Sequence, residues 1–426
     1  MSEPATEVRK PKRVATWKIV LVFLGALAVL LIVAVLWISA VGSRRWAAME
    51  KTVRELHAET VARDASRPAL RGVAVAGNGW DDYAIALKAM DAAKGSEAVL
   101  GEFVSRGPKA DRAKVEAVLA AHGAALEPLR RGAARTHARY PIVWQEGFSA
   151  NVPGLLQAQK LANLAVCRSR FLVEEGKPRE AAELLLDTCQ FGRDMGINQV
   201  LISEMIALAI YGVALDELRD LVLSAKLSRE DLLAVAAELE QLDRTFPPHG
   251  FSMMNEALMA GWGFIKLEGG TEEERRALGA PGLVSLGFAS RLLYADAFDT
   301  ELDFMKRAAE AEGRPWPEVQ KLGQEMEAEG SRLKNPISKI MVPGLISSTR
   351  SGRERRAQLR FVLVAARYRA TGEAPDLDDP FGTKLRTSRS GDRLKVWSVG
   401  RDGVDDGGAG GWKAAAGADL VLEVDR

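Results

Sequence analysis

Only two cysteines and four histidines occur among the 426 residues, so the usual ligands of zinc are scarce. The histidines stand in no HExxH spacing and the cysteines in no Cys-x-x-Cys pair, which excludes a zinc site of either kind. We expect each histidine to be solvated or locally hydrogen-bonded. Nucleophile and nucleotide motifs are missing too: Gly147 to Asn151 lacks the second glycine of an esterase elbow, and no P-loop or dinucleotide fingerprint occurs. The sequence therefore displays no catalytic constellation.

An excess of either charge is also lacking. The 58 basic residues balance 57 acidic ones, for a formal net charge of +1 at pH 7. With no overall field directed toward a polyanion, we do not expect nucleic acid as a partner. Charged residues make up 27% of the chain and stand among regularly spaced apolar ones, a pattern that argues against disorder. The chain is long enough for two or more folded domains.

What the sequence does contain is a long uncharged run, from Ile19 to Val41. As a helix, a run of this length crosses a bilayer core of ~30 Å. A secretory signal peptide is the alternative, but its apolar region is typically ~7 to 15 residues long. Trp17 and Trp37 suit the two headgroup regions. We therefore predict a retained transmembrane helix at 18–42 that binds membrane lipid.

Basic residues flank this helix on both sides, with one more before it than after it: Arg9, Lys10, Lys12, Arg13 and Lys18 against Arg44, Arg45, Lys51 and Arg54. Because short basic tails stay in the cytoplasm, we expect residues 1–17 to be a cytoplasmic tail. The predicted location is the inner membrane, in a single pass, with the bulk of the chain periplasmic or extracellular.

The two cysteines could form a disulfide in such a compartment. The segment Glu175 to Pro178 indicates the end of one helix and the beginning of the next. In an antiparallel hairpin of these two helices, Cys167 and Cys189 would lie at similar heights. A bridge there would be worth ~3 kcal/mol if unstrained. The alternative is that both are buried free thiols that pack as small hydrophobic side chains.

Apolar residues recur at helical spacing from Arg44 to about Arg350, so we predict an all-α extracytoplasmic domain at 43–334. Residues 155–192 resemble one helical hairpin of the tetratricopeptide type, and we describe the domain as solenoid-like, although no second copy follows at a 34-residue period. Thr271 and Glu274 form a capping box that predicts a helix start.

Four acidic residues of this domain are candidates for an acidic site. Glu204 interrupts the apolar run from Val200 to Leu215, which we interpret as a central buried helix, and a buried carboxyl is a typical catalytic acid. The others fall on one helix face: Asp296, Asp299 and Asp303. The structural alternatives are that Glu204 reaches solvent or a basic partner, and that Asp303 pairs with Arg307 on a solvated face.

Residues 335–426 change in pattern, from a helix that ends near Thr371 to a small α+β module. Asp379 to Gly382 predicts a turn, and two strands are expected at Leu394–Val399 and Leu420–Val424. Between the strands lies an acidic, glycine-rich loop that begins at Gly400.

In this order the residues resemble the globular end of the major pseudopilin of type II secretion, over about a fifth of the chain. The resemblance consists of a helix ending Tyr-x-x-x-Gly-x-x-Pro, an Asp-Pro-aromatic-Gly turn, a strand running into Ser-x-Gly-x-Asp-Gly, and an Asp-initiated last strand. It implies a calcium ion held by Asp402, Asp405, Asp406 and Asp419. The layout as a whole looks like a group of uncharacterised bacterial membrane-anchored proteins. No pilin-type cleaved leader precedes Ile19.

These features predict a non-catalytic, membrane-anchored envelope protein that presents a helical interaction domain and a calcium-stabilised, pseudopilin-like cap to an envelope protein partner. Two alternatives stay open. One is an envelope hydrolase with its acidic site in the helical domain, and the other is an accessory component of a type II secretion-like machine.

Overall fold

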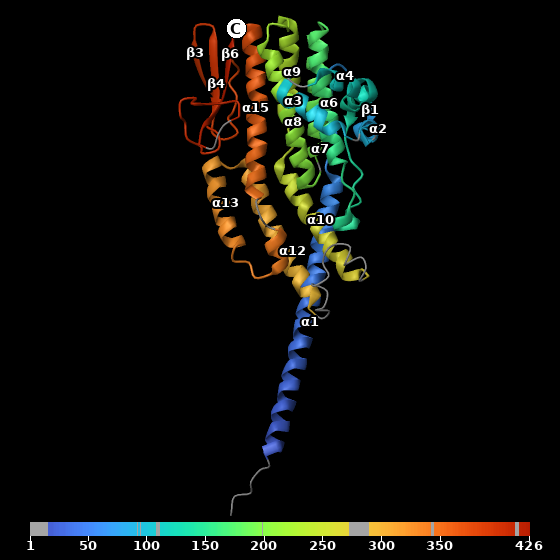
Figure 1. The fold of residues 1–426 in the computed structure, drawn as a ribbon. Helices are drawn as coiled ribbons and strands as arrows, with labels where there is room; N and C mark the ends of the chain where they lie inside the picture. Colours follow the sequence, from blue (N-terminus) through green and yellow to red (C-terminus); the bar gives the residue numbers. More distant parts are fainter. Residues whose placement is uncertain are drawn as a thin grey trace, which may run out of the picture.

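One helix, α1 (Thr16–Ala62), is both the apolar N-terminal segment and part of the core (Figure 1). Its first half stands alone and is long and apolar enough to span a membrane. From Gly42 onward it enters the body, where it buries a stripe of side chains: Trp46, Met49, Val53 and Leu56. The boundary predicted at residue 42 therefore falls inside an uninterrupted helix. The structure is a computed structural model that describes residues 16–91, 93, 95–107, 111–197, 199–271, 289–341, 345–413 and 417–426.

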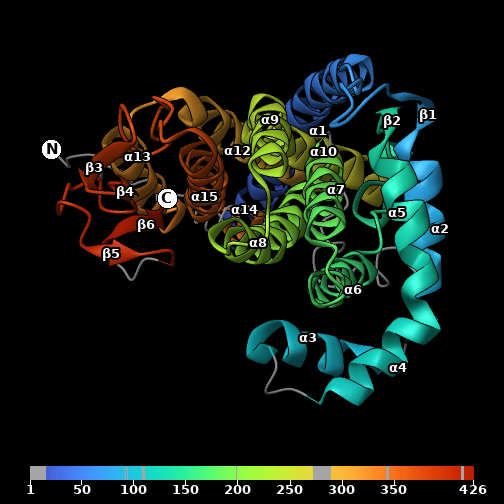
Figure 2. The ribbon, with the colours of Figure 1, turned by 90° about the horizontal axis from the view of Figure 1, so that it is seen from above.

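The body is mainly helical, as predicted. Its further helices are α2 (Gly79–Asp91), α3 (Ser96–Arg106), α4 (Arg112–His122), α5 (Leu126–Ala133), α6 (Leu155–Glu174), α7 (Pro178–Gly196), α8 (Leu201–Leu223), α9 (Arg229–Arg244), α10 (His249–Gly269), α12 (Ser290–Glu310), α13 (Trp316–Gly330), α14 (Pro336–Met341) and α15 (Leu345–Thr371). Seen from above, the helices α2 to α5 and the C-terminal sheet lie on opposite sides of the central helices (Figure 2).

The central helices confirm two sequence predictions. The helix stop and restart near Gly176 separates α6 from α7, which pack as a hairpin, and the apolar run at 200–215 lies in α8, which packs on α7. Further along the chain, α10 packs on α12 and α1, and the buried side chains form one continuous cluster. Glu274 of the predicted capping box lies outside the described residues.

The all-α prediction missed one small strand pair. β1 (Val75–Asn78) pairs in parallel with β2 (Arg135–His137) beside α2 and α5. Gly79 and Gly132 pack closely there: a Cβ at Gly132 would lie 2.4 Å from the ring of Tyr83. Such short strands carry no alternating apolar pattern, so periodicity could not reveal them.

The C-terminal part combines α15 with a four-stranded sheet of order β3-β4-β6-β5 (Figure 1). The strands are β3 (Arg386–Ser390), β4 (Arg393–Ser398), β5 (Gly410–Gly411) and β6 (Asp419–Asp425). β4 pairs antiparallel with β3 and β6, and α15 packs on β4 and β6. The two predicted strands are thus present, whereas β3 has a polar sequence that did not indicate a strand. Asp379 closes the predicted turn by accepting the N–H of Phe381 at 2.9 Å.

Candidate functional site

Glu204, the candidate acid of α8, is buried and holds two side chains of α10. Both of its carboxylate oxygens lie close to Nδ1 of His249, at 2.7 and 2.8 Å, and the hydroxyl of Ser252 donates to Oε2. Glu204 is 5% exposed and His249 is also 5% exposed. Glu204 is therefore buried, as the predicted central helix requires, and it also has the basic partner of the structural alternative, a histidine that the sequence did not single out.

His249 joins Glu204 to a third helix. Its other ring nitrogen, Nε2, lies 3.1 Å from Oγ of Ser348, in the first turn of α15. When Nδ1 of a neutral imidazole donates to the carboxylate, Nε2 is left as the acceptor for the serine hydroxyl. Glu204, His249 and Ser348 thus form a carboxylate–imidazole–hydroxyl array, which we call the Glu–His–Ser array.

The start of α10 fixes the backbone of His249. The carboxylate of Glu312 accepts the backbone N–H of His249 and of Gly250, each at 3.0 Å, and so satisfies two donors that a helix N-terminus leaves open. Pro247 and Pro248 lead directly into the helix. The imidazole is held at both ring nitrogens and at its own backbone, which leaves it little freedom to turn.

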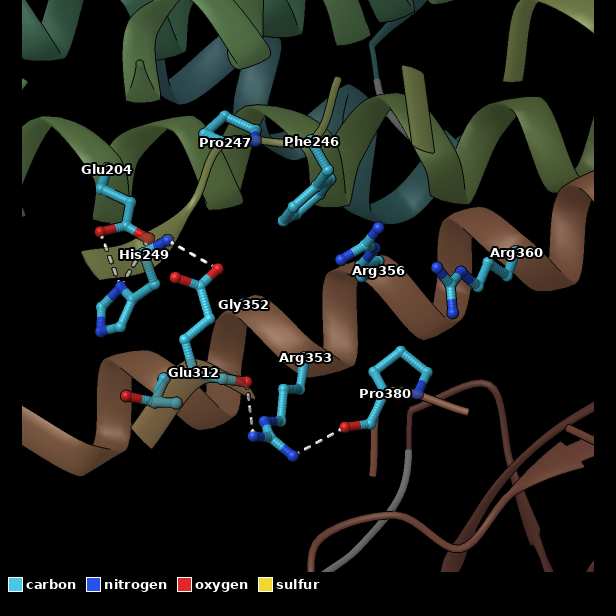
Figure 3. Close-up of a pocket in the computed structure, with 11 residues that line it drawn as sticks. Glu204, Phe246, Pro247, His249, Glu312, Gly352, Arg353, Arg356, Arg360 and Pro380 are labelled. Carbon is cyan, nitrogen blue, oxygen red and sulfur yellow. Dashed lines mark hydrogen bonds and ion pairs between the residues drawn. The ribbon is translucent and has the colours of Figure 1, made fainter. Parts of the chain in front are cut away.

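A cavity of about 120 Å³ borders the array (Figure 3). Glu204, His249 and Thr349 form part of its wall, and Ser348 does not. Ser348 is buried, at 3% exposure, and among the described residues Oγ1 of the adjacent Thr349 is buried without a hydrogen-bond partner.

Three arginines of α15 continue the cavity wall away from the array: Arg353, Arg356 and Arg360 (Figure 3). They also line a larger open groove of about 660 Å³ between α15 and the turn at Pro380. The cavity thus adjoins a surface groove.

These arginines differ in how fully they are neutralised. Arg356 and Arg360 share the carboxylate of Asp243, with their closest contacts at 2.9 and 3.0 Å. Arg353 donates to backbone carbonyls, among them that of Pro380 at 2.8 Å, and burial lowers its pKa. In the described chain Arg353 has no carboxylate within ion-pair distance.

The predicted acidic face of α12 is engaged in ion pairs elsewhere. Arg45 of α1 contacts Asp296 at 3.1 Å and Asp299 at 2.7 Å, and Asp303 pairs with Arg307 at 3.2 Å. These three aspartates therefore tie α12 to α1 and to its own next turn, and in the described chain they form no ion pair or hydrogen bond with Glu204.

The opposite face of α12 carries a carboxyl that the sequence did not indicate. Glu301 is 1% exposed, and its Oε2 has no hydrogen-bond partner in the described chain. Burial raises the pKa of Glu301 well above its usual range, and the nearby carboxyl of Glu256 raises it further. Glu256 itself accepts the backbone N–H of Leu201 at 3.0 Å and so caps α8.

The loop aspartates implied by the pseudopilin resemblance are only partly gathered. Oδ2 of Asp419 accepts the backbone N–H groups of Asp406 and Gly408, at 3.1 and 2.8 Å, while Oδ1 is buried without a partner. Asp405 is instead engaged by Arg386 at 2.6 Å, and Asp402 accepts the N–H of Val404.

Within the described residues, no three His, Cys, Asp or Glu side chains are arranged to hold a metal ion. The unpartnered Oδ1 of Asp419 fits a role as a cation ligand, and the engagement of Asp405 by an arginine does not. The calcium site stays a prediction.

The two cysteines lie in the α6–α7 hairpin as buried free thiols. This is the alternative to the disulfide that the sequence left open. Burial raises the pKa of the Cys167 thiol to about 12 and shifts that of Cys189 in the same direction. At neutral pH both are therefore protonated and unreactive as nucleophiles.

Comparisons with known proteins do not assign this chain to a family. No family model matches it, and no curated protein or solved structure does so either.

Proposed function

We propose that this is a single-pass membrane protein of the bacterial envelope, anchored by the first half of α1, which displays the helical body and its C-terminal cap outside the cytoplasm. The observation that carries the proposal is the continuity of α1. The same helix supplies an exposed apolar segment and four buried core residues, so the body is held at a fixed position next to the bilayer. We propose an envelope protein as the partner that the displayed body contacts.

Labelling with a membrane-impermeant maleimide tests the anchor and its orientation. We expect Val404→Cys, at a position that is 54% exposed, to react in spheroplasts, and Ser2→Cys in the tail to react only after lysis. The native thiols are buried and provide the unreactive background. Recovery of the intact chain in the soluble fraction would refute the anchor, and the reverse labelling pattern would refute the orientation.

The partner proposal requires a separate experiment. Cross-linking in intact cells followed by detergent solubilisation should recover specific envelope proteins with the full chain. Recovery of the chain alone would count against a partner. If deletion of the gene stopped secretion of type II substrates, the role would be that of a secretion accessory component instead.

The cap is proposed to be stabilised by calcium, with Asp419 as the central ligand and Asp402, Asp405 and Asp406 around it. At a free calcium concentration 100 times the Kd, binding adds about 2.7 kcal/mol to the stability of the cap. Alanine at Asp402, Asp405 and Asp406 should abolish the rise in melting temperature that calcium gives, and should change little in EGTA. Asp376→Ala is a matched control, because Asp376 is exposed and pairs only with Lys384. Equal calcium responses in all variants would exclude the site.

A further inference from the structure

We propose that the Glu–His–Ser array is an acyl-transfer site, in which Ser348 is the nucleophile, His249 the general base and Glu204 the residue that positions the base, and that it cleaves short-chain carboxylic esters. This inference goes beyond the proposed function, which concerns location and display and holds with or without a reaction. It gives the hydrolase alternative a defined set of residues, of which only Glu204 was a candidate from the sequence.

The geometry of the array meets the requirements of nucleophilic catalysis. The hydroxyl-to-base distance is 3.1 Å and the base-to-carboxylate distance is 2.7 Å, both within hydrogen-bond reach. The carboxylate fixes the tautomer in which Nε2 can take the serine proton. The three residues come from α8, α10 and α15, and Glu312 holds the start of α10, so the alignment rests on packed helices rather than on a loop.

In the proposed reaction, Oγ of Ser348 bonds to the carbonyl carbon of the ester while its proton moves to Nε2 of His249. The bond from this carbon to the alcohol oxygen then breaks, and the departing oxygen takes the proton from Nε2. Water next attacks the acyl carbon and gives a proton to Nε2, which returns it to Oγ as the acyl–serine bond breaks. The net change is ester plus water to acid plus alcohol, so water is the only co-reactant.

The cavity and the groove select the substrate class. A cavity of about 120 Å³ admits only a short acyl group. The adjoining groove is lined by Arg353, which among the described residues pairs with no carboxylate and donates to the backbone carbonyls of Ala311, Glu312, Arg314 and Pro380. A carboxylate or phosphate on the alcohol part of the ester would face this guanidinium.

Thr349 lines the cavity and the adjacent Ser348 does not, so in the proposed reaction the acyl carbon reaches Oγ of Ser348 past Thr349. Among the described residues the Thr349 hydroxyl has no hydrogen-bond partner, so its removal breaks no hydrogen bond there. Thr349→Ala should widen this entry without weakening the array. A faster reaction of Ser348 in Thr349→Ala distinguishes a reactive array from a merely structural one.

Small sulfonyl fluorides test the proposal on the detergent-solubilised full chain. Methanesulfonyl fluoride transfers its sulfonyl group to an activated serine and releases fluoride, and mass spectrometry of the peptides locates the modified residue. We expect modification of Ser348, faster in Thr349→Ala, and reduced at least ~100-fold in His249→Gln. Ser347→Ala is the matched control, because Ser347 is the exposed neighbour in the same turn and the variant keeps Ser348, so modification of Ser348 should continue.

The pH dependence of the modification rate tests the positioning role of Glu204. Modification of the wild-type chain should slow at acidic pH, where a protonated imidazole cannot accept the serine proton. Glu204→Gln should slow it at every pH, and Glu204→Asp should restore part of the rate. The array is structural only if the folded wild-type chain leaves Ser348 unmodified, or if Ser348 is modified equally in His249→Gln. Because no membrane is present in this assay, its failure would leave the anchor proposal intact.

Discussion

Removal of residues 1–41 should leave a soluble, folded body, whereas removal of residues 1–62 should unfold it. Among the described residues, the first deletion takes away an apolar segment whose side chains are almost all exposed. The second also removes Trp46, Met49, Val53 and Leu56 from the core. At about 1.5–3 kcal/mol per buried apolar side chain, these four together contribute about 6–12 kcal/mol before the entropy of ordering the helix is subtracted. That is comparable to the whole stability of an ordinary domain, which is about 5–15 kcal/mol.

Circular dichroism melts and size-exclusion chromatography of the two shortened chains measure this effect. The chain that begins at residue 42 should be monodisperse without detergent and melt cooperatively. A third chain, which keeps residues 42–62 but carries Val53→Asp, separates the loss of core packing from the loss of chain length. Cooperative melting of the chain that begins at residue 63 would show that the second half of α1 is dispensable.

Asp194→Ala should destabilise the body by about 3–5 kcal/mol, because it leaves buried cations without their partner. Asp194 is fully buried in α7 and contacts Arg67 at 3.1 Å and Arg193 at 3.0 Å. It also accepts a hydrogen bond from the hydroxyl of Tyr83, at 2.7 Å. The two guanidinium groups are themselves almost fully buried, at 1% and 4% side-chain exposure, so water cannot replace the lost carboxylate.

Asp220→Ala is the matched control for this substitution. Asp220 also pairs with an arginine, Arg219 at 2.5 Å, but its side chain is 61% exposed. An exposed pair is worth about 0–1 kcal/mol, so urea denaturation should show a small change for Asp220→Ala and a large one for Asp194→Ala. Similar changes in both variants would mean that the body relaxes around Asp194 and admits water.

Much of this fold was predictable because long helices repeat their pattern many times. The apolar half of α1, the α6–α7 hairpin, the buried helix α8 and the end of α15 each follow from periodicity or from turn residues. The short strands β1 and β2 and the polar strand β3 were not predictable in this way. β1 and β2 pair with each other across a long stretch of chain, which leaves no local pattern, whereas β3 pairs with β4 in a tight hairpin but is too polar to show the apolar alternation of a strand.

The candidate site shows the same limit more strongly. Glu204 was visible because a carboxylate inside an apolar run is costly unless it has a partner. That partner, His249, lies 45 residues away, and Ser348 is 99 residues from His249. Neither spacing belongs to a recurring motif, so the array could be recognised only by geometry. Likewise, the acidic face of α12 could be seen in the sequence, but its pairing with Arg45 of α1 could not.

The expectation of a non-catalytic protein and the inference of an acyl-transfer site exclude each other. Modification of Ser348 decides between them, since a purely structural serine does not react with a small sulfonyl fluoride through a neighbouring histidine.

Because α1 is unbroken, any tilt of its apolar first half would also move the body that packs on its second half. Residues 42–62 extend the apolar first half of α1 by about 32 Å without a hinge. Helices in bilayers lean by about 20° on average, and the angle changes with hydrocarbon thickness. A lean of about 20° moves the far end of this extension sideways by about 11 Å, carrying the packed body with it. Bilayer thickness would thus set the direction in which the cap points.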